Sequence, residues 1–197
     1  MQVRNLRQCD KAKVLELGKK IFRETDEIPL LQKALFLCVP ELSLVAVEDK
    51  SIVGFTLVCQ KMTNVYYSFL GKIPNCYELA FLGISPQCQG RGLGTRLLKE
   101  TLLAIFQTSN QFTCWLLVDT DNLNAIRLYE KIGFRRWIET TADITPVPGY
   151  IMGISYRRFI KKERKDNNIH RVIPMASNMT SNIPSIMMPN PIQLLMI

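Results

Sequence analysis

The chain has 197 residues, of which 47% are hydrophobic and 21% charged, and its formal net charge is +8. A chain of this length and composition can bury a real core, which excludes a wholly disordered protein and predicts one domain with or without a tail. No run of 18 apolar residues occurs and residues 1–7 lack the apolar core of a secretory signal, so we expect no membrane span and no such signal.

Hydrophobic periodicity and helix breakers divide the chain into alternating helices and strands. Pro29 suits the first turn of a helix that Pro40 ends, and Gly133 suits a helix C-cap. In chain order we predict a strand at 3–6, a helix capped by Asp10 and running to Phe22, a helix from Pro29, a hairpin at 42–58, a strand at 77–84, a helix at 92–106, a strand at 113–118, a helix at 122–132, and strands at 134–141 and 150–156. This order predicts an α/β domain with a mixed sheet.

Positive charge is concentrated near the C-terminus. Residues 157–171 have a net charge of +5, whereas residues 1–156 have a net charge of +3 and no charged residue follows Arg171. Four prolines follow Arg171 and oppose regular structure. We therefore predict a domain at 1–158 and a tail at 159–197 that is basic, then uncharged and rich in Pro, Met and Asn, and disordered. The segment 157–171 is either a solvated charge run or a patch for a ribosome or nucleic acid.

Six cysteines and one histidine restrict the chemistry. No two cysteines form a Cys-x-x-Cys pair and most lie in apolar runs, so we expect reduced thiols in a cytoplasmic, or else nuclear, protein. His170 is the single histidine and lies in a polar, charged stretch. These features predict no metal site and disfavour a Ser-His-Asp or Cys-His hydrolase.

The most informative motif is a glycine-rich turn between the strand at 77–84 and the next helix. It reads Gln89-Gly-Arg-Gly-Leu-Gly-Thr95. Glycines let backbone N–H groups approach an anion, the helix N-terminus adds partial positive charge, and Arg91 and Arg96 can add full charges. The turn therefore predicts a pyrophosphate site. The alternative is a plain helix-capping turn, which does not require three alternating glycines.

Two nucleotide-binding motifs fit this turn less well. A P-loop requires Lys-Ser or Lys-Thr after the glycines, and neither follows here. A Rossmann fingerprint requires a third glycine where this chain has Thr95. The strand before a Rossmann fingerprint also begins a βαβ nucleotide-binding half, whereas the strand at 77–84 lies in the middle of this chain.

The segment Gln89–Gly94 resembles the Gln/Arg-x-x-Gly-x-Gly/Ala signature of the GNAT superfamily of acyl-CoA-dependent N-acyltransferases. A second segment, Asn122-Leu-Asn-Ala-Ile-Arg-Leu-Tyr-Glu-Lys-Ile-Gly-Phe134, is similar to the family's Asn-x-x-Ala-x-x-x-Tyr-x-x-x-Gly-Phe. The resemblance is sharp over residues 77–137 and extends over 2–158 by element order. It implies a single domain with a mixed six- to seven-stranded sheet, about four flanking helices and a flexible C-terminal tail.

The resemblance also implies acetyl-CoA as co-substrate, a primary amine as acceptor and no metal. In the family, the glycine turn holds the CoA pyrophosphate, the end of the preceding strand bonds the pantetheine like an added strand, and the next helix contacts the CoA arm. Carried over to this chain, the cofactor-binding residues are Leu82, Gly83, Ile84, Gln89, Gly90, Arg91, Gly92, Leu93, Gly94, Thr95 and Asn122. We expect Gly83 to mark a close approach of the ligand to the backbone.

Aminolysis of a thioester needs an oxyanion donor, an acid for the leaving thiolate and a base for the amine. A backbone N–H near Leu82 can serve the oxyanion, and Tyr129 is the expected acid, with core packing as its alternative. Glu78 is the expected base, because it stands in an apolar strand where burial raises a carboxyl pKa and where GNAT-type histone acetyltransferases use a glutamate. The alternatives for Glu78 are a partly exposed strand-end residue or an ion pair. A water relay can take the place of a base, and Asp119 and Asp121 are weaker candidates.

Together these inferences predict a GNAT-type N-acetyltransferase in which a primary amine attacks acetyl-CoA directly in a ternary complex. A protein N-terminus or lysine is favoured as acceptor, because the basic segment suits docking on a ribosome or nucleic acid. A small amine or polyamine remains an alternative, as does a CoA-binding module without turnover. The acceptor groove is expected from residues 23–41, 62–76 and 139–150, and no membrane contact is expected.

Overall fold

The computed structural model describes residues 1–22, 27–60, 62–63, 72, 75–108, 112–141 and 148–166. Within these ranges no helix is long and apolar enough to cross a membrane. The elements are, in chain order, β1 (Gln2–Asn5), α1 (Lys11–Ile21), α2 (Glu27–Leu37), β2 (Leu44–Glu48), β3 (Ser51–Cys59), β4 (Cys76–Ile84), α3 (Leu93–Thr108), β5 (Thr113–Asp119), α4 (Leu123–Ile132), β6 (Arg135–Thr140), β7 (Gly149–Ser155) and α5 (Tyr156–Asp166).

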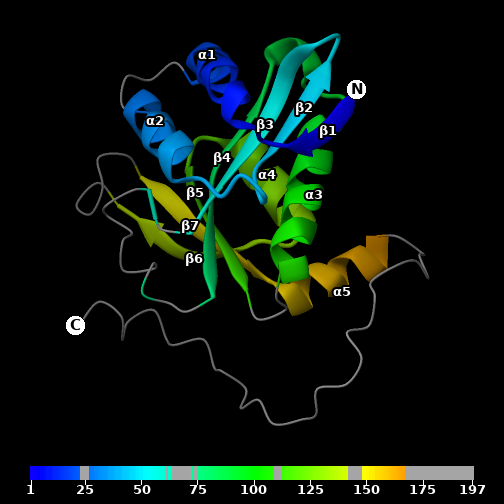
Figure 1. Cartoon of the computed structure of the whole chain (residues 1–197). Helices are drawn as coiled ribbons and strands as arrows, with labels where there is room; N and C mark the ends of the chain where they lie inside the picture. Colours follow the sequence, from blue (N-terminus) through cyan, green and yellow to red (C-terminus); the bar gives the residue numbers. More distant parts are fainter. Residues whose placement is uncertain are drawn as a thin grey trace.

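Seven strands form one sheet in the order β1-β2-β3-β4-β5-β7-β6 (Figure 1). Only β4 and β5 pair in parallel, and every other neighbouring pair is antiparallel. The predicted α/β class with a mixed sheet is therefore confirmed. The described part of the chain contains five α-helices, where about four were expected.

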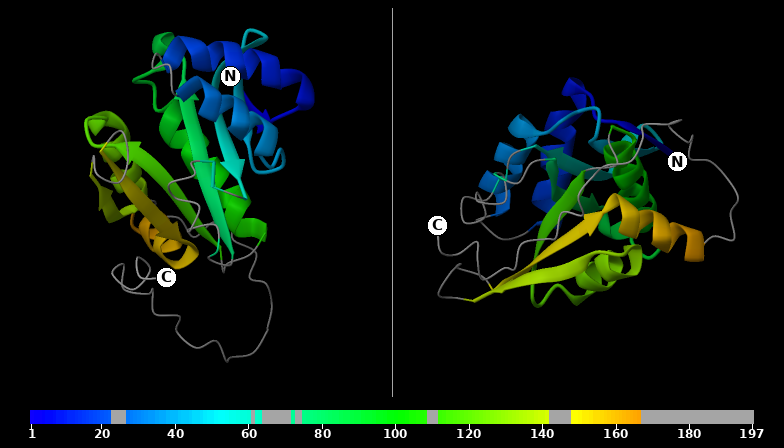
Figure 2. Two further views of the ribbon diagram at one scale, coloured as in Figure 1. Left: turned by 90° about the vertical axis from the view of Figure 1, so that its left-hand side faces the viewer. Right: turned by 90° about the horizontal axis from the view of Figure 1, so that it is seen from below.

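The core lies on both sides of this sheet. Val45 and Phe55 pack with residues of α1 and α2, whereas Leu44, Ala46 and Val58 pack towards α3 and α4. Alternate strand residues point to opposite faces, so β2 and β3 read as continuous apolar runs because both of their faces are covered. Two further views show these helices on either side of the strands (Figure 2).

Helix α5 corrects the predicted start of the tail. Phe159 is fully buried, and its ring centroid lies 5.6 Å from that of Phe106 on α3. The Tyr156 ring also contacts Phe106, at 5.8 Å, and Glu163 pairs with Lys99 of α3 at 2.7 Å. The prediction that the tail begins at residue 159 is thus wrong for residues 159–166, because Tyr156, Phe159 and their neighbours form a short apolar stripe inside a basic run. Residues 167–197 lie outside the described residues.

This packing gives the first testable prediction. Phe159→Leu should destabilise the fold by about 1 kcal/mol, because leucine fills the site between α5 and α3 less completely. The melting temperature should fall by roughly 2–4 °C, as measured by circular dichroism.

Deletion of residues 172–197, which follow the basic run, should leave the melting temperature nearly unchanged. A larger loss from the deletion than from the substitution would contradict the expectation that this segment contributes little to stability.

Candidate active site

Strands β4 and β5 part near the middle of the sheet. They pair only from Cys76 to Glu78 of β4, while β4 continues to Ile84 against β3 and β5 continues to Asp119 against β7. The two halves of the sheet diverge visibly beyond this point (Figure 2). In the described structure the edge of β4 after Leu79 therefore has no strand partner on the β5 side, and its peptide groups can receive an extended ligand.

A bulge in β4 accompanies the parting. The register with β3 shifts between Leu57 and Val58, which face Phe81 and Leu79, so Ala80 is an extra residue on β4. A bulge increases local twist and redirects the strand, which is the physical cause of a sheet opening at such a point. The bulge was not predicted, because the apolar run of β4 gives no local signal for it.

The glycine turn lies at the end of this same strand. Gly90 and Gly92 have φ values of +75° and +76°, and a Cβ on either would meet no atom within 4 Å. The backbone conformation, not packing, therefore requires glycine at both positions. Gln89 closes the turn, because its Nε2 donates to the carbonyl of Ile84 at 3.1 Å.

The turn presents unpaired donors at the start of α3. Arg96 is the first residue whose backbone N–H bonds back into the helix, to Gly92 at 3.0 Å. Among the described residues, no acceptor is paired with the N–H groups of residues 90–95. The Leu93 side chain is buried in the core, so at this position only the backbone can contact a ligand. These features are those of an anion site at a helix N-terminus.

Arg91 of the glycine turn and Arg96 of α3 differ in whether they are free to contact an anion. Arg91 is exposed and has one loose ion pair, with 3.9 Å between its Nη1 and Glu48 Oε2. Arg96 is held along α3 by Glu100, with 2.7 Å from Nε to Oε1. Arg91 is therefore the guanidinium that can turn towards an anion, since its present partner lies at the limit of an ion pair.

Gly83 is required by packing. A Cβ at this position would lie 2.7 Å from the Phe55 ring and 3.2 Å from Ile21. Close packing of β4 against β3 and α1 therefore explains the glycine, and contact of a ligand with the backbone of residue 83 stays a prediction. Leu82 and Ile84 still lie on the unpaired part of β4 and pack together towards α3.

Helix α4 brings Asn122 and Tyr129 to the β5 side of the opening. The Asn122 Oδ1 accepts the N–H of Ala125 at 3.2 Å and caps the helix, which leaves its amide NH₂ facing outwards as a donor. Tyr129 is 8% exposed, and its ring lies 5.7 Å from that of Phe134. Burial raises the pKa of the Tyr129 phenol, with a smaller contribution from Cys114 of β5. The phenol thus remains protonated at neutral pH.

Glu78 is buried at the last paired position of β4. Its Oε2 accepts the backbone N–H of Thr63 at 2.7 Å, and its Oε1 accepts the Thr63 hydroxyl at 3.0 Å. The Lys33 Nζ of α2 donates to the Thr63 carbonyl at 2.7 Å. Burial raises the pKa of Glu78 to about 7, and the bonds from Thr63 and the charge of Lys33 lower it by less. The predicted burial is confirmed, whereas the strand-end and ion-pair alternatives are not what the structure shows.

Trp115 is the residue at this point that sequence reasoning missed. It stands opposite Glu78 in the β4–β5 register, its ring lies 4.6 Å from that of Trp137, and it packs over Gly153. Its indole Nε1 is buried and has no hydrogen-bond partner among the described residues. A tryptophan in an apolar strand gives no signal that its polar atom will be left unpaired at the opening.

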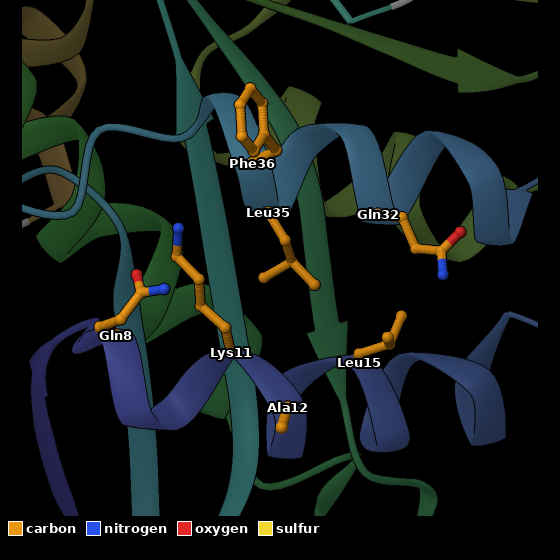
Figure 3. Close-up of a pocket in the computed structure, with 7 residues that line it drawn as sticks. All are labelled: Gln8, Lys11, Ala12, Leu15, Gln32, Leu35 and Phe36. Carbon is orange, nitrogen blue, oxygen red and sulfur yellow. The ribbon is translucent and has the colours of Figure 1, made fainter.

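Other parts of the chain offer less. Asp119 and Asp121 supply backbone carbonyls to the turn before α4. No cluster of metal ligands occurs in the described ranges. The predicted acceptor segments include residues 23–26, 64–71, 73–74 and 142–147, which lie outside the described residues. An apolar groove of about 270 Å³ lies between α1 and α2 (Figure 3). It contains none of the predicted catalytic or cofactor-binding residues, but Gln32, Leu35 and Phe36 in its lining belong to the predicted acceptor segment 23–41.

The sequence profile of the acetyltransferase (GNAT) family matches residues 11–134, more than half of the chain. The chain belongs to the GNAT family. The parted strands, the glycine turn and the capped α4 helix are thus parts of a GNAT domain, and the resemblance inferred from the two motifs is confirmed.

The GNAT relatives found by sequence match a limited stretch. N-alpha-acetyltransferase RimI of Mycobacterium tuberculosis is 41% identical over 70 residues, which cover 35% of this chain and 42% of the relative. Spermidine N(1)-acetyltransferase of Escherichia coli K12 is 43% identical over 51 residues, covering 26% and 27%. The chain thus matches less than half the length of these relatives.

Solved GNAT structures match more of the chain at lower identity. The ribosomal-protein-S18-alanine N-acetyltransferase of Escherichia coli has a TM-score of 0.61 at 17% identity, covering 79% of this chain and 93% of that one. Arabidopsis thaliana Naa50, in complex with the bisubstrate analogue CoA-Ac-MVNAL, has a TM-score of 0.59 at 22% identity, covering 78% and 97%. These likenesses support the fold alone.

Proposed function

We propose that this GNAT protein transfers an acetyl group from acetyl-CoA to a primary amine within a ternary complex. The observation that carries the proposal is that the unpaired edge of β4 leads directly into the glycine turn. A pantetheine arm added along residues 82–84 would place its pyrophosphate at the N–H groups of residues 90–95. Asn122 would contact the same arm from the start of α4.

The reaction defines what the protein must supply. The neutral amine attacks the thioester carbonyl, the C–N bond forms, and the carbonyl oxygen becomes an oxyanion that a backbone N–H of β4 near Leu82 can stabilise. The C–S bond then breaks and the electron pair leaves on sulfur as a thiolate. One proton of the amine is transferred, directly or through water, so that amide and CoA thiol are formed. An amine that arrives as an ammonium must first lose one further proton to a base.

Two side chains are proposed for the proton steps. Tyr129 is the proposed donor to the leaving sulfur, because its phenol stays protonated and α4 holds it beside β5. Glu78 is the proposed base, because burial raises its pKa to about 7, within the working pH range, and because it stands where β4 and β5 part. Both of its oxygens already accept from Thr63, so a water is needed to link it to an amine.

We propose a peptide or protein amine as the acceptor. A relative found by sequence and named for N-alpha-acetylation, which is 41% identical over 70 residues, supports this choice. A spermidine acetyltransferase among the relatives supports a polyamine as the second candidate. The six free cysteines agree with a cytoplasmic setting.

The test is release of CoA thiol from acetyl-CoA with a panel of acceptors. Peptides with free N-termini, N-blocked lysine peptides and polyamines are supplied in parallel at equal amine concentration. Rapid release with either peptide class supports the proposal, and release with polyamines alone supports the second candidate. Thermal stabilisation by acetyl-CoA without release in any arm would indicate a CoA-binding module, and neither release nor stabilisation would contradict the proposal.

The variant Glu78→Gln tests whether Glu78 accepts a proton in the reaction or only holds Thr63 in place. With the carboxyl pKa at about 7, kcat/KM of the native protein should rise with pH through 7, and the variant should lose this inflection. The native carboxyl keeps its proton between pH 4.5 and about 7 while the unfolded chain releases it, so stability falls as pH rises through this window. The fall should be roughly 3 kcal/mol, and it should be absent from the variant.

Two measurements decide the role of Glu78. The pH dependence of kcat/KM is compared with that of urea unfolding for both proteins. If the pH dependence of stability changes and that of the rate does not, Glu78 only anchors Thr63. Thr63→Val is the matched control, because it removes one of the two bonds to Glu78 and keeps the carboxyl.

A further inference from the structure

Helix α5 has one face that is fixed to the domain. Phe159 is buried against Phe106, Glu163 pairs with Lys99, and Arg158 donates from Nε to the carbonyl of Gly133. The helix is therefore anchored at α3 and at the C-cap of α4. Figure 1 shows α5 in gold beside the end of α3.

The opposite face of α5 is exposed and carries only cations. We call it the α5 basic face, and its members are Arg157, Lys161, Arg164 and Lys165. They occupy positions i, i+4, i+7 and i+8, which fall within about 100° of arc and along about 12 Å of the helix. Within the described ranges none of the four takes part in an ion pair.

This charge distribution lowers the stability of the helix. The helix has six cations and two acids, and its acid Glu163 is turned to α3. Like charges spaced four apart repel one another, and cations in the first turn oppose the helix dipole. Arg157 and Arg158 stand in that first turn, and the neighbouring Arg135 lowers the pKa of Arg158 further than burial alone does. Solubility alone requires only charged residues on the surface, and it does not require four cations on one face of a helix.

We infer that the α5 basic face binds the phosphate backbone of a double-stranded nucleic acid, independently of its sequence. A row of long cations on a fixed helix places several positive charges along a path of regularly spaced phosphates. The face has no aromatic residue for stacking on bases, so contact with the backbone is the mode that its residues support.

Two other anionic partners fit this face less well. A lipid surface is normally bound by an amphipathic helix that inserts its apolar face, and the apolar residue Phe159 is sealed inside the core. A protein interface is normally built around a buried aromatic or aliphatic anchor, and the α5 basic face provides none. Only the charges are available for contact, and regularly spaced phosphates suit a row of cations on a rigid helix.

The test uses the full chain and labelled 24-base-pair duplexes of RNA and of DNA with the same sequence. Fluorescence anisotropy is recorded from 50 to 200 mM salt. Four phosphate contacts predict a slope of about −3.6 for log K against log salt, and a loss of affinity on the order of 100-fold over this range. Similar affinity for both duplexes would support contact with the phosphate backbone that they share. Higher affinity for the RNA duplex would identify double-stranded RNA as the nucleic acid that is bound.

A pair of variants with equal charge assigns the binding to α5. R157Q/K161Q/R164Q/K165Q should weaken duplex binding by about tenfold or more at 50 mM salt and flatten the slope. K13Q/K19Q/K20Q/K50Q removes four exposed cations elsewhere and should change both quantities much less. Both variants should fold and keep the native transfer rate on a short peptide, and the α5 variant should melt no lower than the native protein, because it loses like-charge repulsion along the helix.

Three results would overturn the inference. The first is no duplex binding at 50 mM salt, and the second is an equal loss of affinity in the two variants. The third is binding to vesicles containing phosphatidylserine as tight as binding to the duplex, with both reduced alike in the α5 variant, since this would reveal an unspecific charged surface.

Discussion

Gly92→Asp should weaken acetyl-CoA binding by on the order of 10–100-fold, measured by calorimetry. The substitution adds a carboxylate to open space beside the N–H groups proposed to hold the pyrophosphate. The like charges repel, and the carboxylate can accept the same N–H groups and so compete with the phosphates. The φ of +76° also disfavours any residue with a Cβ, so part of the loss reflects strain in the turn.

Two control variants separate charge from strain. Gly92→Ala introduces the strain without the charge, and it should weaken binding less than Gly92→Asp. Gln107→Asp introduces the same charge at the exposed far end of α3 and should leave the affinity unchanged. Acetyl-CoA affinity that is equal in Gly92→Asp and the native protein would show that the pyrophosphate lies elsewhere.

The features that the sequence predicted well are local ones. Gly90, Gly92 and Gly133 all have positive φ, a property that the residue type itself signals at a turn or helix end. The helix predicted at 122–132 is observed as α4, at Leu123–Ile132, with Asn122 as its N-cap. Because these features depend on a few neighbouring residues, they could be read from the chain before the fold was known.

The features that the sequence missed depend on tertiary contacts. Gly83 is fixed by the ring of Phe55, a residue on another strand, and Phe159 is fixed by Phe106, more than fifty positions earlier. The pairing of Glu78 with Thr63 and the orphaned indole of Trp115 arise only when β3, β4 and β5 come together. Burial of Glu78 could be predicted from its apolar strand, but its partner could not.

Tyr129→Phe should lower kcat by on the order of 100-fold and leave the affinity for acetyl-CoA nearly unchanged. The substitution removes a single hydroxyl and keeps the ring against Phe134, so the fold should be retained. Because burial raises the pKa of this phenol above that of a thiol, full transfer of its proton to the thiolate runs uphill. The phenol therefore acts mainly by donating a hydrogen bond to the sulfur as the C–S bond breaks.

This mechanism places the effect in the chemical step and gives it a pH signature. The native kcat should show no loss from phenol ionisation up to pH 10, since the raised pKa keeps Tyr129 protonated there. Tyr156→Phe is the matched control, because it removes a hydroxyl from a ring that packs on Phe106 at the α3–α5 contact. Its kcat should stay native. If Tyr129→Phe also kept the native kcat and pH profile, the ring of Tyr129 would serve only to pack α4 on the sheet, and a different group would have to donate a hydrogen bond to the leaving sulfur.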